Sequence, residues 1–401
     1  MRRPELDHIL TMMLNSYPEV SDLLFTINKP LQVESSGELK AVECDPQIGA
    51  LTPFQTEMLA LNLLGENQWH IEDLLRRGSC DSAYTLADKA RFRINIFSQR
   101  GNYSIVLRKL NTKIPSLVDL NLPETLRAVP KEKTGLVLVT GATGSGKSST
   151  LAAVLNEVNQ NKAIHIITLE DPVEFVYCHD KATFNQRELG TDFDSFASGL
   201  RAALRQAPKI VLVGEMRDRE TVKIALSAAE TGHLVLSTLH TIDAGQTINR
   251  ILGMFETDEQ EQIRLRLADT LRWIVSQRLA PKIGGGRQPL VEIMGSNLRT
   301  QEAIRLGESE GKTFYDIISA SYPFGWRTFD HATLEAYEQG LVTEETAMLY
   351  CTKRGMLTRG IDQIKKKRGE VTSDISALRM RPDAETKQGM PPALPATLKL
   401  K

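Results

Sequence analysis

The stretch Gly141-Ala142-Thr143-Gly144-Ser145-Gly146-Lys147-Ser148 decides how this chain of 401 residues is expected to fold. Its spacing follows the pattern G-x-x-x-x-G-K-[ST] of a phosphate-binding P-loop. The apolar residues 136–139 before it predict a buried strand, and residues 149–155 after it predict a helix. A strand, a loop and a helix in this order distinguish the motif from an ordinary glycine-rich turn, so we predict a nucleotide-binding domain.

The residue types in the loop suit a polyphosphate. Glycine permits backbone angles that a side chain would block, so the loop can wrap phosphates with its N–H groups at the start of a helix. Lys147 would place a positive charge near the β and γ phosphates, and the Ser148 hydroxyl can ligate Mg²⁺. We therefore predict ATP and Mg²⁺ as ligands. The expected phosphate cradle comprises Gly141, Thr143, Gly144, Ser145, Gly146, Lys147, Ser148 and Ser149.

Composition and charge limit the class of protein. The chain is 41% hydrophobic and 25% charged, which is ordinary for a globular protein, and its length suggests two or three domains. The formal net charge of −1 argues against a general attraction to nucleic acid or anionic lipid. The 4 cysteines form no C-x-x-C pair, so we expect neither a zinc site nor a disulfide framework, and a reducing compartment fits.

The sequence does not predict insertion into a membrane. Glu5 and Asp7 interrupt the start of the chain, where a secretory signal would be apolar. No apolar run approaches the ~18 residues that are needed to span a bilayer. We expect a cytoplasmic protein, with any membrane contact made through a partner.

The chain divides into regions of different pattern and composition. From the N-terminus we expect a small α+β domain at residues 1–110, a linker at 111–133, a nucleotide domain at 134–284, a helical bundle at 285–368 and a disordered tail at 369–401. Alternating strand and helix patterns in the nucleotide domain predict a mostly parallel sheet wrapped by helices. Prolines punctuate the linker and the tail, and three consecutive glycines from residue 284 predict a flexible break.

Local signals predict two helices in the N-terminal domain. Apolar residues at helical spacing over residues 6–17 predict an opening amphipathic helix. Residues 52–64 predict a second helix, because Thr52 suits the N-cap, Pro53 the first turn and Gly65 the end.

Strand patterns in the same domain predict a small sheet. Short strands are expected over residues 21–39 and a hairpin over residues 91–108. Arg91 and Arg93 alternate with apolar residues, so they should share one face of the first hairpin strand. The pattern alone favours a solvated basic face.

Acidic residues follow two predicted strands of the nucleotide domain. Glu170-Asp171-Pro172-Val173-Glu174 follows residues 164–169, and Gly214-Glu215 follows residues 210–213. Because ligands of open parallel sheets bind beyond the carboxyl ends of the strands, these carboxylates should gather near the P-loop. We assign Glu215 to Mg²⁺, through water, and Glu174 to the attacking water, and the two roles could be exchanged. The alternative is that the acids at 170, 171 and 174 are helix-cap and surface residues.

Two of the 7 histidines flank the fourth predicted strand, residues 234–239. A single histidine is usually a structural residue, but His233 and His240 bracket a strand next to the expected nucleotide site. The position suits a sensor that hydrogen-bonds the γ-phosphate and reports its loss. His240 is the stronger candidate of the two.

Taken in order, these motifs resemble those of the type IV pilus retraction ATPases, the PilT/PilU family of secretion ATPases. The P-loop resembles that family's Walker A motif, and residues 167–174 resemble its acidic box. Residues 212–218 resemble its Walker B motif, which carries glutamate, and residues 228–241 resemble its histidine box. The resemblance covers residues 6–367 and rests on several linked motifs in the right order.

The resemblance implies a RecA-like P-loop NTPase domain, a smaller PAS-like N-terminal domain and a C-terminal helical bundle, assembled as a homohexamer. It implies Mg²⁺-dependent ATP hydrolysis that powers or assists pilus retraction in twitching motility, acting on an inner-membrane platform protein. Residues 111–133 would be the hinge between two rigid domains. Family arginines that reach the phosphates match Arg93 and Arg108, which makes the arginine face an expected phosphate contact.

Departures from the family pattern leave alternatives open. The retraction motif Ala-Ile-Arg-Asn-Leu-Ile-Arg-Glu is only partly present at residues 303–310, and residues 141–142 and 204–208 lean toward the PilU branch. PilU-type proteins commonly assist a PilT motor, so one alternative is an accessory subunit that needs a second pilus ATPase. A secretion or pilus-assembly ATPase is disfavoured by the absence of a four-cysteine zinc insert. A ring translocase on nucleic acid is disfavoured by the near-neutral charge.

Overall fold

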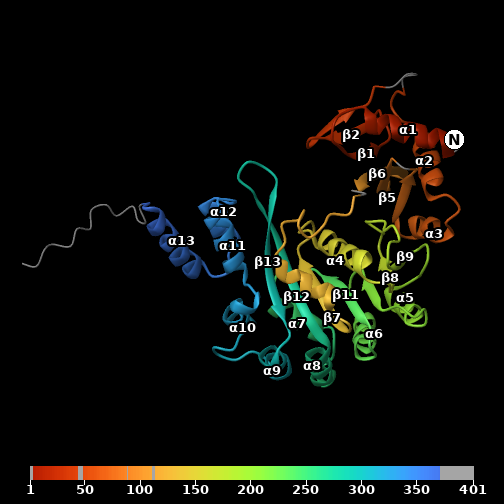
Figure 1. Cartoon of the computed structure of the whole chain (residues 1–401). Coiled ribbons are helices and arrows are strands. Elements are labelled where there is room, and N and C mark those ends of the chain that lie inside the picture. Colours follow the sequence, from red (N-terminus) through yellow and green to blue (C-terminus); the bar gives the residue numbers. More distant parts are fainter. Residues whose placement is uncertain (1–2, 44–47, 88, 111–112, 371–401) are drawn as a thin grey trace, which may run out of the picture.

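The computed structural model describes residues 3–43, 48–87, 89–110 and 113–370. Within these ranges the chain forms an antiparallel N-terminal sheet with its helices, a mostly parallel sheet wrapped by helices, and a group of C-terminal helices (Figure 1). The α/β class that the sequence predicts is confirmed. No helix in the described ranges is long and apolar enough to cross a membrane.

Antiparallel strands in the order β3-β2-β1-β6-β5-β4 form the N-terminal sheet. They are β1 (Val20–Phe25), β2 (Gln32–Ser35), β3 (Glu38–Ala41), β4 (Ser79–Leu86), β5 (Ala90–Gln99) and β6 (Asn102–Leu110). The helices of this domain are α1 (Arg3–Asn15), α2 (Pro53–Leu64) and α3 (Gln68–Arg77). The Thr52 hydroxyl accepts the Gln55 N–H at 3.3 Å, which confirms the predicted cap of α2.

The hairpin of β5 and β6 presents its arginines as the alternation predicts. Ile94 and Ile96 are fully buried, whereas Arg91 and Arg93 occupy the other face of β5. The register places Arg93 directly opposite Arg108 of β6. Because opposed residues of an antiparallel pair share one face of the sheet, these arginines form a basic face.

The second sheet has the strand order β13-β12-β7-β11-β10-β8-β9, and neighbours are parallel except β12 and β13. Its strands are β7 (Gly135–Gly141), β8 (His165–Glu170), β9 (Thr183–Glu188), β10 (Ile210–Val213), β11 (Leu234–Leu239), β12 (Leu271–Pro281) and β13 (Arg287–Gly295). The strands expected before the P-loop, the two acidic segments and His240 are confirmed. The sequence pattern did not reveal β9.

Helices cover both faces of this sheet. Leu136 and Leu138 of β7 belong to one core with α5 to α8, while Val137 and Val139 belong to another core with α4. The helices are α4 (Lys147–Asn161), α5 (Phe196–Ala203), α6 (Arg219–Glu230), α7 (Ala244–Leu252) and α8 (Thr257–Thr270). Burial on both faces explains why the central strands are continuous apolar runs.

The glycine run at residues 284–286 is a hairpin turn, and the expected break after the nucleotide domain is wrong at this position. All three glycines have positive φ values of 86°, 101° and 81°, which lets the chain reverse between β12 and β13. The two strands pair from Trp273 with Gly295 to Pro281 with Arg287. The sheet therefore continues to Gly295, beyond the boundary expected from composition.

Much of the expected linker packs on the nucleotide domain. Leu117, Leu126 and Val129 are buried in the same core as α4, and a 3₁₀ helix spans Glu124–Lys131. The Trp273 indole N–H donates to Glu132 Oε1 at 2.8 Å. Residues 117–132 are therefore joined to the nucleotide domain, which leaves the shorter segment before them as the connection between domains.

The helices α11 (Phe329–Glu338), α12 (Glu344–Tyr350) and α13 (Arg354–Arg368) pack beside the β12–β13 hairpin (Figure 1). The preceding helices α9 (Leu298–Leu306) and α10 (Phe314–Ala320) pack instead in the core that contains α7 and α8. Ala280 and Leu290 of the hairpin share a core with Tyr337 and Ala347. The expected tail lies outside the described residues from 371 onward.

Candidate active site

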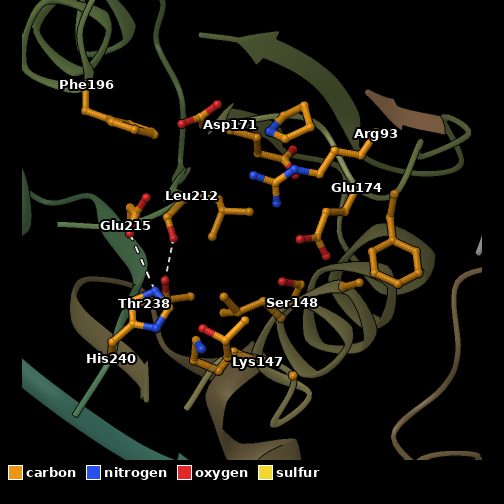
Figure 2. Close-up of a pocket in the computed structure, with 18 of the residues that line it drawn as sticks. Arg93, Lys147, Ser148, Asp171, Glu174, Phe196, Leu212, Glu215, Thr238 and His240 are labelled. Atoms are coloured by element: carbon orange, nitrogen blue, oxygen red, sulfur yellow. Dashed lines mark hydrogen bonds and ion pairs between the residues drawn. The ribbon is translucent and has the colours of Figure 1, made fainter. Parts of the chain in front are cut away.

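A cavity of about 350 Å³ lies at the carboxyl ends of β7, β8, β10 and β11 (Figure 2). The start of α4 forms one side, the loop after β8 forms another, and β5 of the N-terminal domain adds an arginine. The predicted site residues that line this cavity are Arg93, Thr143, Gly144, Lys147, Ser148, Glu174, Glu215 and His240. Residues from five separate sequence segments therefore converge as the parallel topology predicts.

The P-loop has the backbone that its glycines permit. Gly141, Gly144 and Gly146 have φ values of 142°, 76° and 91°. A Cβ on Gly141 would lie 2.5 Å from the carbonyl oxygen of Gln277, so a larger residue does not fit there. Lys147 Nζ donates to the carbonyl oxygens of Gly141 at 2.9 Å and Ala142 at 3.0 Å. The lysine charge is thus held at the mouth of the loop, where phosphates would lie.

The lysine is electrostatically coupled to the two acids of the site. Burial lowers the pKa of Lys147, while the charges of Glu174 and Glu215 raise it. The Glu215 side chain is only 13% exposed and forms an ion pair with Arg217. His240 Nε2 lies 3.6 Å from Glu215 Oε2, as the dashed line in Figure 2 shows.

His240 is suited to act as a neutral imidazole near neutral pH. Burial and the positive charge of Lys147 lower its pKa, and the Glu215 carboxylate only partly opposes them. A neutral imidazole can both donate and accept a hydrogen bond, so it can follow a change at a neighbouring phosphate.

The acidic loop after β8 contains residues in different electrostatic states. Burial raises the pKa of Glu170 to about 7, although hydrogen bonds from Thr168, Gln186 and the Glu174 backbone lower it. Figure 2 shows the Glu174 carboxylate pointing into the cavity between Arg93 and Ser148. Glu170 and Asp171 of the same loop also line this cavity. Glu174 stays our candidate for the acid that faces the γ-phosphate.

Six predicted residues do not line this cavity: Arg108, Gly141, Ser145, Gly146, Ser149 and His233. Of these, Gly141 and Ser145 line a second cavity described below. His233 lies at the opposite end of β11 from His240, with Nδ1 3.1 Å from the Ala228 carbonyl oxygen, because the strand between them is fully extended. Arg108 Nε lies 2.8 Å from Asp22 Oδ1 within the N-terminal domain, and its side chain is 69% exposed. Ser149 follows the loop on α4 and does not face the cavity either.

Sequence reasoning overlooked residues that complete the site. Arg217 and Phe196 line the cavity, and Arg217 is the ion-pair partner of Glu215. The Thr238 hydroxyl donates to the Gly214 carbonyl oxygen at 2.6 Å, which ties β11 to the segment that carries Glu215. The position of Arg217 two residues after Glu215 was the available signal, whereas nothing local marks Phe196.

A second cavity of about 430 Å³ lies on the other side of the P-loop. It is lined by the loop together with Ile242, Gln277, Arg278, Leu279, Arg287 and Tyr350. The Ser145 residue of the predicted cradle faces this cavity rather than the first one. The Arg278 guanidinium stacks 3.7 Å from the Phe329 ring centroid and donates to the Tyr350 carbonyl oxygen at 2.6 Å. The P-loop therefore lies between the first cavity, which is lined by acidic and basic side chains, and the second cavity, which has more apolar walls.

The donor set suits Mg²⁺ held by few protein ligands. The Ser148 hydroxyl and the Glu215 carboxylate are hard oxygen donors that line the same cavity. Mg²⁺ usually keeps several waters and binds one or two protein groups together with phosphate oxygens. Within the described part of the chain, no group of three or more His, Cys, Asp or Glu side chains could hold a metal ion. A metal site completed by phosphates fits these residues.

Glu292 of β13, close to Arg278, gives the stability of this region a pH dependence. Its side chain is 4% exposed and accepts the Ala244 N–H at 3.0 Å. Burial raises its pKa from an ordinary 4.5 to about 7, against the opposing effects of that hydrogen bond and Arg278. Between these two pKa values the folded state therefore holds a proton that the unfolded state has released. The contribution of Glu292 to the free energy of unfolding is complete below pH 4.5 and is lost as the pH rises through 7.

We expect Glu292→Gln to raise stability at pH 8 by about 1–3 kcal/mol and to change it little at pH 5. The amide oxygen can still accept the Ala244 N–H, while the buried charge present at high pH is removed. Thermal unfolding of both proteins at the two pH values measures the effect, with the exposed Glu261→Gln as the control. Equal shifts at pH 5 and pH 8 would contradict the assignment.

Comparison with known proteins identifies the family. The model of the family described as type II/IV secretion system protein matches residues 82–313. The type IV pilus ATPase PilU of Pseudomonas aeruginosa is 37% identical over 347 residues, which cover 86% of this chain and 88% of that protein. The retraction ATPase PilT of the same organism is 38% identical over 328 residues, covering 82% and 93%.

Solved structures agree with these matches. The pilus retraction motor PilT with bound ADP has a TM-score of 0.78 and 40% identity, covering 90% of this chain and 99% of that one. The ATPase DotB of Legionella pneumophila has a TM-score of 0.76 and 27% identity, covering 87% and 95%. The chain therefore belongs to the type II/IV secretion ATPases and, within them, to the PilT/PilU retraction ATPases. The match to PilU is consistent with the PilU-like features of the sequence.

Proposed function

We propose that this protein is a cytoplasmic, Mg²⁺-dependent ATPase that forms a homohexamer and powers or assists retraction of a type IV pilus. The observation that carries the proposal is the convergence of Lys147, Ser148, Glu174, Glu215 and His240 in one cavity. The similarity to PilU and PilT over most of the chain supports pilus retraction as the process served. An inner-membrane platform protein would receive the movement of the ring.

The charged and polar residues that converge in the cavity have separate roles in phosphoryl transfer. Lys147 binds the β and γ phosphates, and Ser148 with Glu215 would hold Mg²⁺, which neutralises phosphate charge when bound. Glu174 accepts a proton from the attacking water and orients it toward the γ-phosphate. His240, next to Glu215, follows the state of the γ-phosphate, and Arg93 stabilises the charge that develops in the transition state.

Arg108 supports a site shared between subunits. It is 69% exposed on the face where Arg93 lies opposite it, yet it does not reach the cavity of its own chain. In a ring, the N-terminal domain of one subunit would present this face to the nucleotide of its neighbour. Arg108 would then contribute from the neighbouring subunit, as an arginine supplied in trans does in other nucleotide hydrolases.

The second cavity is our candidate for the nucleoside end of ATP. A P-loop binds the polyphosphate along its length, so a nucleotide with its γ-phosphate near Glu174 extends past the loop toward Leu279 and Tyr350. Apolar side chains there suit the faces of a base, and Arg278 and Arg287 suit the polar groups of the nucleoside.

The steady-state ATPase rate at increasing protein concentration tests the proposal. If the active site is completed by a neighbouring subunit, the rate per subunit should rise cooperatively with concentration, in step with the hexamer seen by sedimentation. Omission of Mg²⁺ should abolish turnover. A rate per subunit that is independent of assembly would contradict the shared site.

An accessory subunit is the second candidate function. The altered residues 303–310 lie at the end of α9, where Leu306 is 80% exposed, and they lack the centre of the retraction motif. Nucleotide binding with almost no turnover at any concentration would favour this alternative. Turnover that appears after addition of a second pilus ATPase would establish it.

A further inference from the structure

Arg91 lies at the contact between the N-terminal and nucleotide domains, outside the cavity. Its Nη2 donates to Glu188 Oε2 at 2.8 Å, and its Nε donates to the carbonyl oxygen of Val173 at 3.0 Å. The same Glu188 oxygen accepts the Val173 N–H at 3.2 Å. The arginine and the glutamate therefore hold both polar groups of one backbone residue, an arrangement that we call the Val173 clamp.

Both side chains of the clamp are shielded from water, and both residues make a further hydrogen bond. Their exposed fractions are 17% for Arg91 and 13% for Glu188. Arg91 Nη1 donates to Thr85 Oγ1 at 3.1 Å, and the Glu188 N–H donates to Asp192 Oδ2 at 2.8 Å. Charge-assisted hydrogen bonds in such surroundings are stronger than those on an open surface. The clamp is thus a defined link between β5 and the end of β9.

The clamped residue directly precedes Glu174. The Val173 carbonyl and the Glu174 N–H belong to one planar peptide group, so holding the carbonyl restricts the direction in which Glu174 leaves the backbone. Successive polar groups of this segment are therefore restrained from both domains, immediately beside the carboxylate that faces the cavity (Figure 2).

We propose that Arg91 and Glu188 are positioning residues that orient Glu174 for ATP hydrolysis. They would make the rate of hydrolysis depend on the position of the N-terminal domain against the nucleotide domain. This inference rests on the proposed ATPase function. Arg93 lies two residues along β5 from Arg91 on the same face and lines the cavity. One strand thus directs Arg91 to the Val173 backbone and Arg93 to the cavity, so a displacement of β5 changes both contacts together.

A second set of contacts between the N-terminal and nucleotide domains does not involve Val173. Asn67 Nδ2 donates to the Gly190 carbonyl oxygen at 3.2 Å and to Thr191 Oγ1 at 3.4 Å. A Cβ on Gly190 would lie 2.6 Å from the Trp69 ring, which shows how closely the domains approach here. Thr191→Ala removes a contact between the domains without altering the clamp, so it is a matched control.

Kinetics of the full-length protein test the proposal. Arg91→Gln and Glu188→Gln should each lower kcat about tenfold or more while KM for ATP changes less than about threefold, because the P-loop is untouched. The double variant should be no slower than the single variants, because the two side chains act as one unit. Thr191→Ala and the exposed Arg76→Gln should stay within about twofold of wild type. Sedimentation at the assay concentration confirms that equal assemblies are compared.

Amide hydrogen exchange gives a second readout that does not require turnover. Exchange of the amides of residues 173–175 should be faster in both single variants than in wild type and Thr191→Ala. Unchanged exchange, or faster exchange with wild-type kcat, would overturn the positioning role. Additive losses of kcat together with a lowered unfolding temperature would also overturn it, since they indicate a merely structural pair. A wild-type protein without turnover would refute the proposed function and, with it, the catalytic part of this inference, even if exchange responds.

Discussion

Lys147→Ala is expected to reduce ATP hydrolysis by about 10²–10³-fold or more, to the background of the assay. The lysine is the cation whose Nζ is held at the P-loop carbonyls, and its charge is coupled to Glu174 and Glu215 across the cavity. Its removal leaves the β and γ phosphates without their principal point charge. Phosphate release by purified wild-type and variant protein at saturating ATP and Mg²⁺ measures the loss.

The control for this prediction is Lys181→Ala, which removes an exposed lysine of the same domain. It should keep the wild-type rate, because surface substitutions away from a site rarely matter. Equal unfolding temperatures of the two variants would show that the loss is not one of folding. Wild-type turnover by Lys147→Ala would refute the assignment of the P-loop as the catalytic phosphate site.

Glu174→Gln is expected to leave ATP binding intact and to slow hydrolysis by about 10²–10⁴-fold. The amide keeps the size of the side chain in the cavity but cannot accept a proton from water. The matched comparison is Glu215→Gln, which removes the carboxylate charge next to Arg217 and His240. That variant should need a higher Mg²⁺ concentration for half of its maximal rate, because Glu215 is the proposed metal ligand.

Titration of ATP affinity and of the Mg²⁺ dependence separates the two carboxylates. A slow Glu174→Gln protein with wild-type affinity and wild-type Mg²⁺ dependence would support the assigned roles. Normal hydrolysis by Glu174→Gln would move the water-activating role to Glu215. Loss of ATP affinity in Glu174→Gln would instead show that this residue acts in binding.

The parts of the site that the sequence predicted are those with a local signature. Residues 141–148 fold as a P-loop because its glycines permit positive φ and because a buried strand and a helix flank it. Glu215 and His240 were found because each lies just after the end of an apolar run. In a parallel sheet the carboxyl ends of such strands lie at one edge. The positions of these residues in the sequence therefore predicted where they lie in the structure.

The prediction failed where a residue's surroundings come from distant segments. His233 and His240 flank the same strand, yet an extended strand places them at opposite ends of the sheet. The glycines at 284–286 resemble a domain break, and only the pairing of β12 with β13 shows that they form a turn inside the sheet. Arg91 has the same sequence signal as Arg93, but it contacts Val173 rather than the cavity.

By itself, the sequence determined the ATP-binding domain, the order of its motifs and the identities of the groups that carry the chemistry, because these depend on spacing along the chain. The tertiary structure decided which of those groups meet, where the nucleotide domain ends, and how the N-terminal domain holds the backbone beside Glu174. The physical reason is that strand order and domain contact bring together residues that are far apart in sequence. Arg91 and Glu188, at 2.8 Å across two sheets, have no local pattern that relates them.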